Sequence, residues 1–180
     1  MNETLSPKKL ADEGQAAYKK GDFISAGNAF RDAAEGYKLS GDELAAAEMA
    51  NNLSVSLLQA GQAEKALQAT LGTEEVFKRS GDLRRQAMAI GNQAAALEAL
   101  DRLQEAAQHY ELSAELLKQI GDNETRASVM QSMSALQLRQ GRQFEALATM
   151  QAGLNGIKRP TTKQRLLRKL LQIPFKYLNR

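Results

Sequence analysis

The sequence predicts an all-α protein, a right-handed α-solenoid of four helical hairpins followed by one C-terminal helix. The dipeptide Gly-Asp recurs at intervals of 40 residues, at Gly41-Asp42, Gly81-Asp82 and Gly121-Asp122. Alanine recurs at the same interval as Ala26, Ala66, Ala106 and Ala146. Aromatic residues make up only 5% of the chain and alanine is abundant, which suits closely packed helices better than sheets.

The Gly-Asp pairs predict where helices end and begin. Glycine adopts the left-handed conformation that ends a helix, and aspartate is a good N-cap for the next one. A second break falls in the middle of each repeat, at Gly21-Asp22, Gly61-Gln62, Asp101-Arg102 and Gly141-Arg142. Each repeat is therefore expected to hold two antiparallel helices of about 17 residues, a usual length for globular proteins.

These breaks divide the chain into one repeat domain and a tail. The repeat domain covers residues 1–160, with repeats at about 6–40, 41–80, 81–120 and 121–160. Ser6-Pro7 is the expected start of the first helix, since proline is favoured at the first helical position. Residues 161–180 are expected to form a basic, amphipathic capping helix and tail. One hairpin cannot bury its apolar face alone, so neighbouring hairpins must stack.

The repeat resembles the tetratricopeptide repeat (TPR) family. Leu10, Gly14, Ala26, Phe30 and Ala33 follow the family pattern of large, small, alanine, ring and small residues. Two features depart from it: a lysine replaces the closing proline, and the repeat exceeds the usual length of about 34 residues. The longer helices resemble those of the G-protein-signalling modulators and the kinesin light chains. The resemblance covers about residues 6–160 and implies a protein-binding scaffold or adaptor.

The residue types argue against catalysis. The chain has no cysteine and one histidine, His109, which disfavours disulfides and a metal site. We find no glycine-rich phosphate loop and no nucleophile–base pair at a recognisable spacing. The sequence therefore predicts no enzyme activity, no cofactor and no metal. It contains neither an apolar signal core nor a bilayer-length apolar run, so we expect a cytoplasmic protein.

The resemblance also implies a ligand groove, because first helices line the concave side of TPR solenoids. The residues expected to bind a peptide there are Asn51, Asn52, Val55, Asn92, Ala95, Gln131, Ser132 and Ala135. The first repeat adds Lys8, Ala11, Asp12, Gln15, Tyr18 and Lys19 to the same surface. An asparagine amide matches both the donor and the acceptor of a peptide backbone. The alternative is that Asn52 and Asn92 cap local structure or face water.

The tail is the strongest charge feature of the chain. Eight Lys or Arg and no acidic residue lie between Lys158 and Arg180, whereas the remainder holds 16 basic and 21 acidic residues. Thr162 is the expected N-cap, and Leu170 is in phase with the core residues of earlier first helices, which predicts a structural cap. The alternative is contact with an anionic membrane or another polyanion through basic residues at Lys163, Arg165, Arg168 and Lys169.

The sequence therefore predicts a non-enzymatic scaffold that binds an extended peptide or a partner protein in the groove. An adaptor recruited to an anionic surface by its basic C-terminal helix is the alternative. Nucleic acid is an unlikely partner, since no reading motif is present. Self-association and the identity of the ligand are left open.

Overall fold

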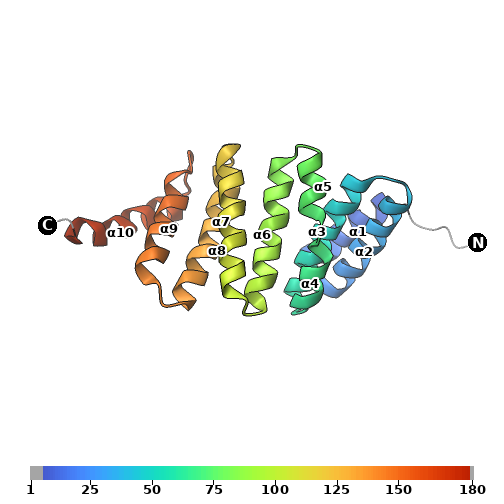
Figure 1. The fold of residues 1–180 in the computed structure, drawn as a ribbon, viewed down its shortest axis with the longest axis horizontal. Helices are drawn as coiled ribbons and strands as arrows, with labels where there is room; N and C mark the ends of the chain where they lie inside the picture. The colour runs from blue at the N-terminus through green and yellow to red at the C-terminus, as the bar shows by residue number, and fades with distance from the viewer. Residues whose placement is uncertain (1–5, 179–180) are drawn as a thin grey trace, which may run out of the picture.

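The computed structural model describes residues 6–178, and side chains as far as Leu171. The described chain is helical, with no strand. The helices are α1 (Pro7–Lys19), α2 (Phe23–Leu39), α3 (Glu43–Gln59), α4 (Ala63–Thr70), α5 (Thr73–Arg79), α6 (Leu83–Ala99), α7 (Leu103–Gln119), α8 (Asn123–Arg139), α9 (Gln143–Asn155) and α10 (Thr162–Leu178). They form a row of hairpins along the long axis of the molecule, which confirms the α-solenoid (Figure 1).

The helix ends follow the predicted chemistry. The glycines of the three Gly-Asp pairs have φ angles of 78°, 75° and 70°, in the left-handed region. The side chains of Asp22, Asp42, Asp82 and Asp122 each accept a hydrogen bond from the backbone N–H three residues on. Such an N-cap contributes about 1 kcal/mol. Asp101 takes the left-handed conformation in the third repeat, with φ 59°.

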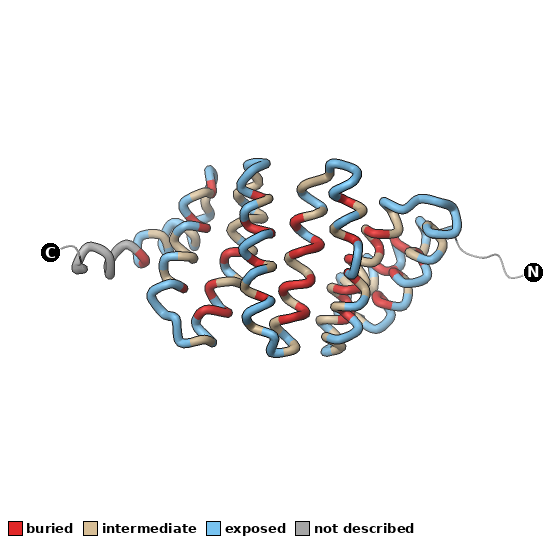
Figure 2. Tube along the Cα trace, in the orientation of Figure 1, coloured by how far each residue is buried: buried red, intermediate tan, exposed pale blue. Residues whose placement is uncertain are grey.

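The repeated alanines are buried where neighbouring helices pack together. Ala26, Ala66 and Ala106 are completely buried, and Ala146 is 1% exposed. Gly14 faces a similar restriction, because an added Cβ would lie 2.8 Å from ring atoms of Phe30. Figure 2 shows buried positions recurring along successive hairpins while the turns between helices are exposed.

The second repeat departs from the prediction. Its second helix was expected to be continuous, but it is broken into α4 and α5 at Leu71 and Gly72. Leu71 is extended (ψ 124°) and Gly72 is left-handed (φ 80°). The break leaves the Thr70 carbonyl without its helical partner, and two side chains donate to it: the Thr73 hydroxyl at 2.8 Å and the Gln93 amide at 3.1 Å.

This hydrogen-bond network is largely buried and links four helices, α3, α4, α5 and α6. The Thr73 hydroxyl also lies 3.1 Å from the Asn51 side-chain oxygen on α3. The Gln93 amide on α6 also donates to Glu74 on α5, at 2.8 Å. A buried polar group left without a partner costs about 1–3 kcal/mol. The network therefore stabilises the break.

The C-terminal helix differs in register from the prediction. Leu171 is 8% exposed and packs against Leu154 and Ile157, whereas Leu170 is 53% exposed and does not join the core. The prediction placed Leu170 in the core by extending the 40-residue interval beyond the fourth repeat, where the interval no longer holds. Helix α9 stops after 13 residues rather than 17, and the connection through Pro160 resets the phase of α10.

The N-cap of α10 is Thr161 rather than Thr162. The Thr161 side chain accepts from the Gln164 backbone N–H at 3.3 Å, and the Gln164 side chain accepts from the Thr161 N–H at 2.8 Å. This reciprocal pair is a capping box.

Candidate functional site

The candidate site lies on the surface formed by the first helices of the repeats, α1, α3, α6 and α8, which we call the first-helix face. Helices α3 and α6 contact one another, and so do α6 and α8. Asn52, Asn92 and Ser132 hold equivalent positions on α3, α6 and α8, and all three are half-buried. Because the helices share one phase, these polar side chains form a row across the face.

Asn52 and Asn92 do not cap local structure. Within residues 6–178, neither side-chain amide has a hydrogen-bond partner in the protein. Asn52 takes part through its backbone instead, since its carbonyl accepts from the Ser56 hydroxyl at 2.9 Å. Both amides are therefore available to an external donor or acceptor.

The N-terminal end of the row contains a cavity of about 230 Å³ beside Asn52. It is lined by Gln15, Tyr18, Lys19, Phe30, Asn52 and Val55. Tyr18 also packs edge-on against Phe23, with ring centroids 5.3 Å apart. The structure thus brings the predicted residues Asn52 and Val55 together with those of α1.

The middle of the face is held by ion pairs and one buried phenol. Arg85 on α6 pairs with Glu48 on α3 at 3.1 Å. Arg139 on α8 pairs with Glu98 on α6, also at 3.1 Å. The Tyr110 hydroxyl donates to the other Glu98 oxygen at 3.0 Å. Burial, and then the Glu98 charge and hydrogen bond, raise the pKa of Tyr110 well above its usual value, so the phenol stays protonated.

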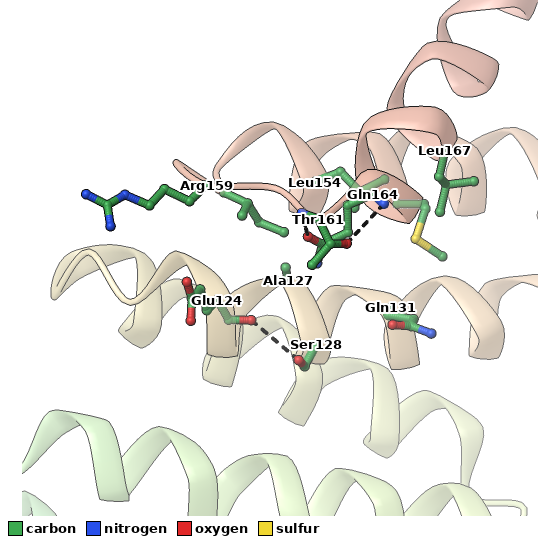
Figure 3. Close-up of a pocket in the computed structure, with 11 residues that line it drawn as sticks. Glu124, Ala127, Ser128, Gln131, Leu154, Arg159, Thr161, Gln164 and Leu167 are labelled. Atoms are coloured by element: carbon green, nitrogen blue, oxygen red, sulfur yellow. Dashed lines mark hydrogen bonds between the residues drawn. The ribbon is translucent and has the colours of Figure 1, made fainter.

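The remaining predicted groove residues are distributed along the face. Ala95 is half-buried on α6, and Ala135 is exposed on α8. Gln131 is exposed and lines a separate cavity of about 360 Å³ between α8, α9 and the start of α10. Figure 3 shows Ala127 and Gln131 on α8, with Thr161, Gln164 and Leu167 above them on the other side of this cavity. Gln131 therefore lies near the tail rather than at the Asn52 end of the row.

Two predicted site residues have structural roles instead. Asn51 is 8% exposed, and its side-chain amide lies 3.1 Å from the Thr73 hydroxyl, so it belongs to the network at the helix break and not to the groove. Arg168 is half-buried and donates to the backbone carbonyls of Leu154 and Ile157. It anchors α10 to the end of α9, so the earlier expectation that its charge faces an external surface is wrong.

Three other basic residues of α10 are accessible. Lys163, Arg165 and Lys169 are exposed, although the Arg165 Nε donates to the Pro160 carbonyl at 3.2 Å. Leu166 and Leu170 are 60% and 53% exposed on the same helix. Sequence reasoning missed this apolar exposure because it assigned Leu170 to the core.

The described residues offer no centre for metal chemistry. No group of three or more His, Asp or Glu side chains within them is placed to hold a metal ion. None of the helices in this part of the chain is long and apolar enough to cross a membrane.

Stacked hairpins with buried small residues at each helix crossing define a helical-repeat protein of the TPR-like class. Residues 11–168 match the family model "Soluble NSF attachment protein, SNAP". The match spans most of the chain, so the chain belongs to the soluble NSF attachment protein family. No curated protein matches it. The match supports a TPR-like repeat and does not extend to the narrower resemblance to G-protein-signalling modulators and kinesin light chains.

Proposed function

We propose that this chain is a non-enzymatic interaction scaffold that holds an extended segment of a partner protein along the first-helix face. One observation carries the proposal: the Asn52 and Asn92 amides lie on adjacent first helices and have no partner among the described residues. A side-chain amide has an NH2 group that donates and an oxygen that accepts, so it can pair with the C=O and N–H groups of a peptide backbone.

The spacing of the helices fits an extended chain. Packed helix axes lie about 8–10 Å apart, and an extended chain rises about 3.3 Å per residue. The two asparagines would therefore meet backbone groups about three residues apart on one bound segment. Ser132 continues the row on α8, and Val55, Ala95 and Ala135 provide small apolar contacts beside it. The family name describes an attachment protein, which agrees with a protein ligand.

The test compares the double variant Asn52→Ala, Asn92→Ala with wild type in a quantitative pull-down. The matched control is Asn28→Ala with Asn155→Ala, two exposed asparagines on the second helices α2 and α9. Each lost hydrogen bond to the backbone is worth about 0.5–1.5 kcal/mol, so the groove variant should bind its partner about tenfold more weakly. Equal recovery of the same partners by the groove variant and the control would refute the proposal.

A second candidate function is recruitment to an anionic membrane or another polyanion through α10. The exposed leucines Leu166 and Leu170 beside the exposed Lys163 and Lys169 favour it. Each basic residue near an anionic surface contributes about 1 kcal/mol. Lys163→Gln with Lys169→Gln should therefore weaken co-sedimentation with phosphatidylserine vesicles at low salt. Unchanged co-sedimentation, or none with wild type, would remove this candidate.

A further inference from the structure

The cavity beside Asn52 is the size of one side chain. Its volume is about 230 Å³, below the range of about 300–1,000 Å³ typical of small-molecule pockets. Three helices form it: α1 provides Tyr18, α2 provides Phe30 and α3 provides Val55. These three side chains give the cavity apolar walls.

The walls are held in place by the core of the first repeat. Phe30 is 3% exposed, and its ring lies over Gly14, where an added Cβ would come within 2.8 Å of it. The Tyr18 ring packs edge-on against Phe23, at 5.3 Å between centroids. A pocket formed before binding loses little conformational entropy when it is filled. The cavity is therefore suited to anchor an apolar side chain.

The rim of the cavity carries an unneutralised charge. Lys19 is exposed, and no carboxylate in the described part of the chain lies within 4.0 Å of its ammonium group. The arginines of the same face differ, because Arg85 and Arg139 are paired with Glu48 and Glu98. An acidic side chain on the ligand would complement Lys19.

We propose that this cavity binds one large apolar side chain of the partner segment, and that Lys19 pairs with an acidic residue close to it in that segment. The inference rests on the proposed groove, because Asn52 lines the cavity and would hold the backbone of the anchored residue. An extended chain advances about 3.3 Å per residue, so the acidic residue should lie within about two positions of the anchor. The ligand is thus an extended peptide with an apolar–acidic pair.

The experiment selects random dodecapeptides, displayed on phage, against the full chain. Four proteins are compared: wild type, Lys19→Glu, Lys20→Glu and the double variant Asn52→Ala, Asn92→Ala. Lys20 is the matched control, since it is the neighbouring exposed lysine and does not line the cavity. Thermal melts of both lysine variants verify that each remains folded.

Wild type should enrich peptides that carry Leu, Ile, Met, Phe or Tyr next to Asp or Glu. Lys19→Glu should exchange the acidic preference for Lys or Arg, and Lys20→Glu should leave it unchanged. In a synthetic copy of an enriched peptide, replacing the apolar residue by serine should weaken binding at least about tenfold.

The outcomes separate the two proposals. Peptides that need Asn52 and Asn92 but share no apolar–acidic pair would overturn the pocket and leave the groove standing. If peptides with an apolar–acidic pair bind the asparagine double variant as tightly as wild type, the groove proposal is overturned instead. Equal effects of Lys19→Glu and Lys20→Glu would refute the role of Lys19. Failure to enrich any peptide would overturn both proposals.

Discussion

Replacing Ala106 with leucine should destabilise the fold more than any surface change of the same size. Ala106 is completely buried on α7, in a cluster with Leu97, Tyr110 and Leu136, which are at most 4% exposed. Leucine adds three carbon atoms where neighbouring side chains already fill the space. Overpacking of this kind costs about 1–3 kcal/mol. For a chain of this length, the melting temperature should fall by roughly 2–12 °C.

The matched control is Ala99→Leu, which makes the same substitution at an exposed position at the end of α6. Alanine and leucine have similar helix propensities, so propensity does not separate the two variants. Thermal unfolding followed by circular dichroism measures both. If Ala106→Leu melts at the same temperature as Ala99→Leu, the alanine column does not mark the closest approach of the helices.

Three further changes test the hydrogen bonds of the structure. Thr73→Val keeps the side-chain shape but removes the hydroxyl from the network at the helix break. The free energy of unfolding, measured by urea denaturation, should fall by about 1–3 kcal/mol. An unchanged free energy of unfolding would contradict the role of that network. Arg168→Gln should speed backbone hydrogen exchange in residues 154–171, because it removes the contacts that hold α10 to the end of α9. The control Lys169→Gln, at an exposed position, should leave the exchange rates unchanged. Equal exchange rates in the two variants would show that Arg168 does not anchor α10. Burial raises the pKa of Asp122, but the N–H and hydroxyl of Thr125 and the Arg84 guanidinium together lower it more, so that the net pKa lies below its usual value of 3.8. The carboxylate therefore stabilises the fold fully at pH well above 3.8, and this contribution is lost as pH falls through the lower folded pKa. The advantage of wild type over Asp122→Asn in urea titrations should accordingly shrink as the pH is lowered into the acid range.

The ends of the helices could be predicted because their chemistry is local. A glycine in the left-handed conformation and an aspartate beside it act on backbone groups within three or four residues, as at Gly41 and Asp42. The alanine column could be predicted because every repeat presents the same environment at Ala26, Ala66 and Ala106. The row of Asn52 and Asn92 followed from the same interval, although its role as a ligand site stays a prediction.

The break between α4 and α5 could not be predicted from the local sequence. A single glycine inside a helix costs only about 1 kcal/mol, so Gly72 alone does not require a break. Thr73 also aligns with small residues of the other repeats, so its position in the sequence indicates a packing role and not a hydrogen bond. The partners that stabilise the break, Asn51 and Gln93, come from neighbouring helices 22 and 23 residues away from the groups they bind. For the same reason Asn51 was wrongly expected in the groove.

By itself, the sequence determined the helical class, most of the helix ends and the buried small residues of each repeat, because each depends on short-range or strictly periodic interactions. Only the tertiary structure decided where the periodicity fails. Helix α9 ends early, so Leu171 rather than Leu170 meets the core and Arg168 binds carbonyls at the end of α9. The cavity of Tyr18, Phe30 and Val55 likewise exists only when three helices meet. Such contacts depend on how separate helices are placed relative to one another, which a repeat interval does not specify.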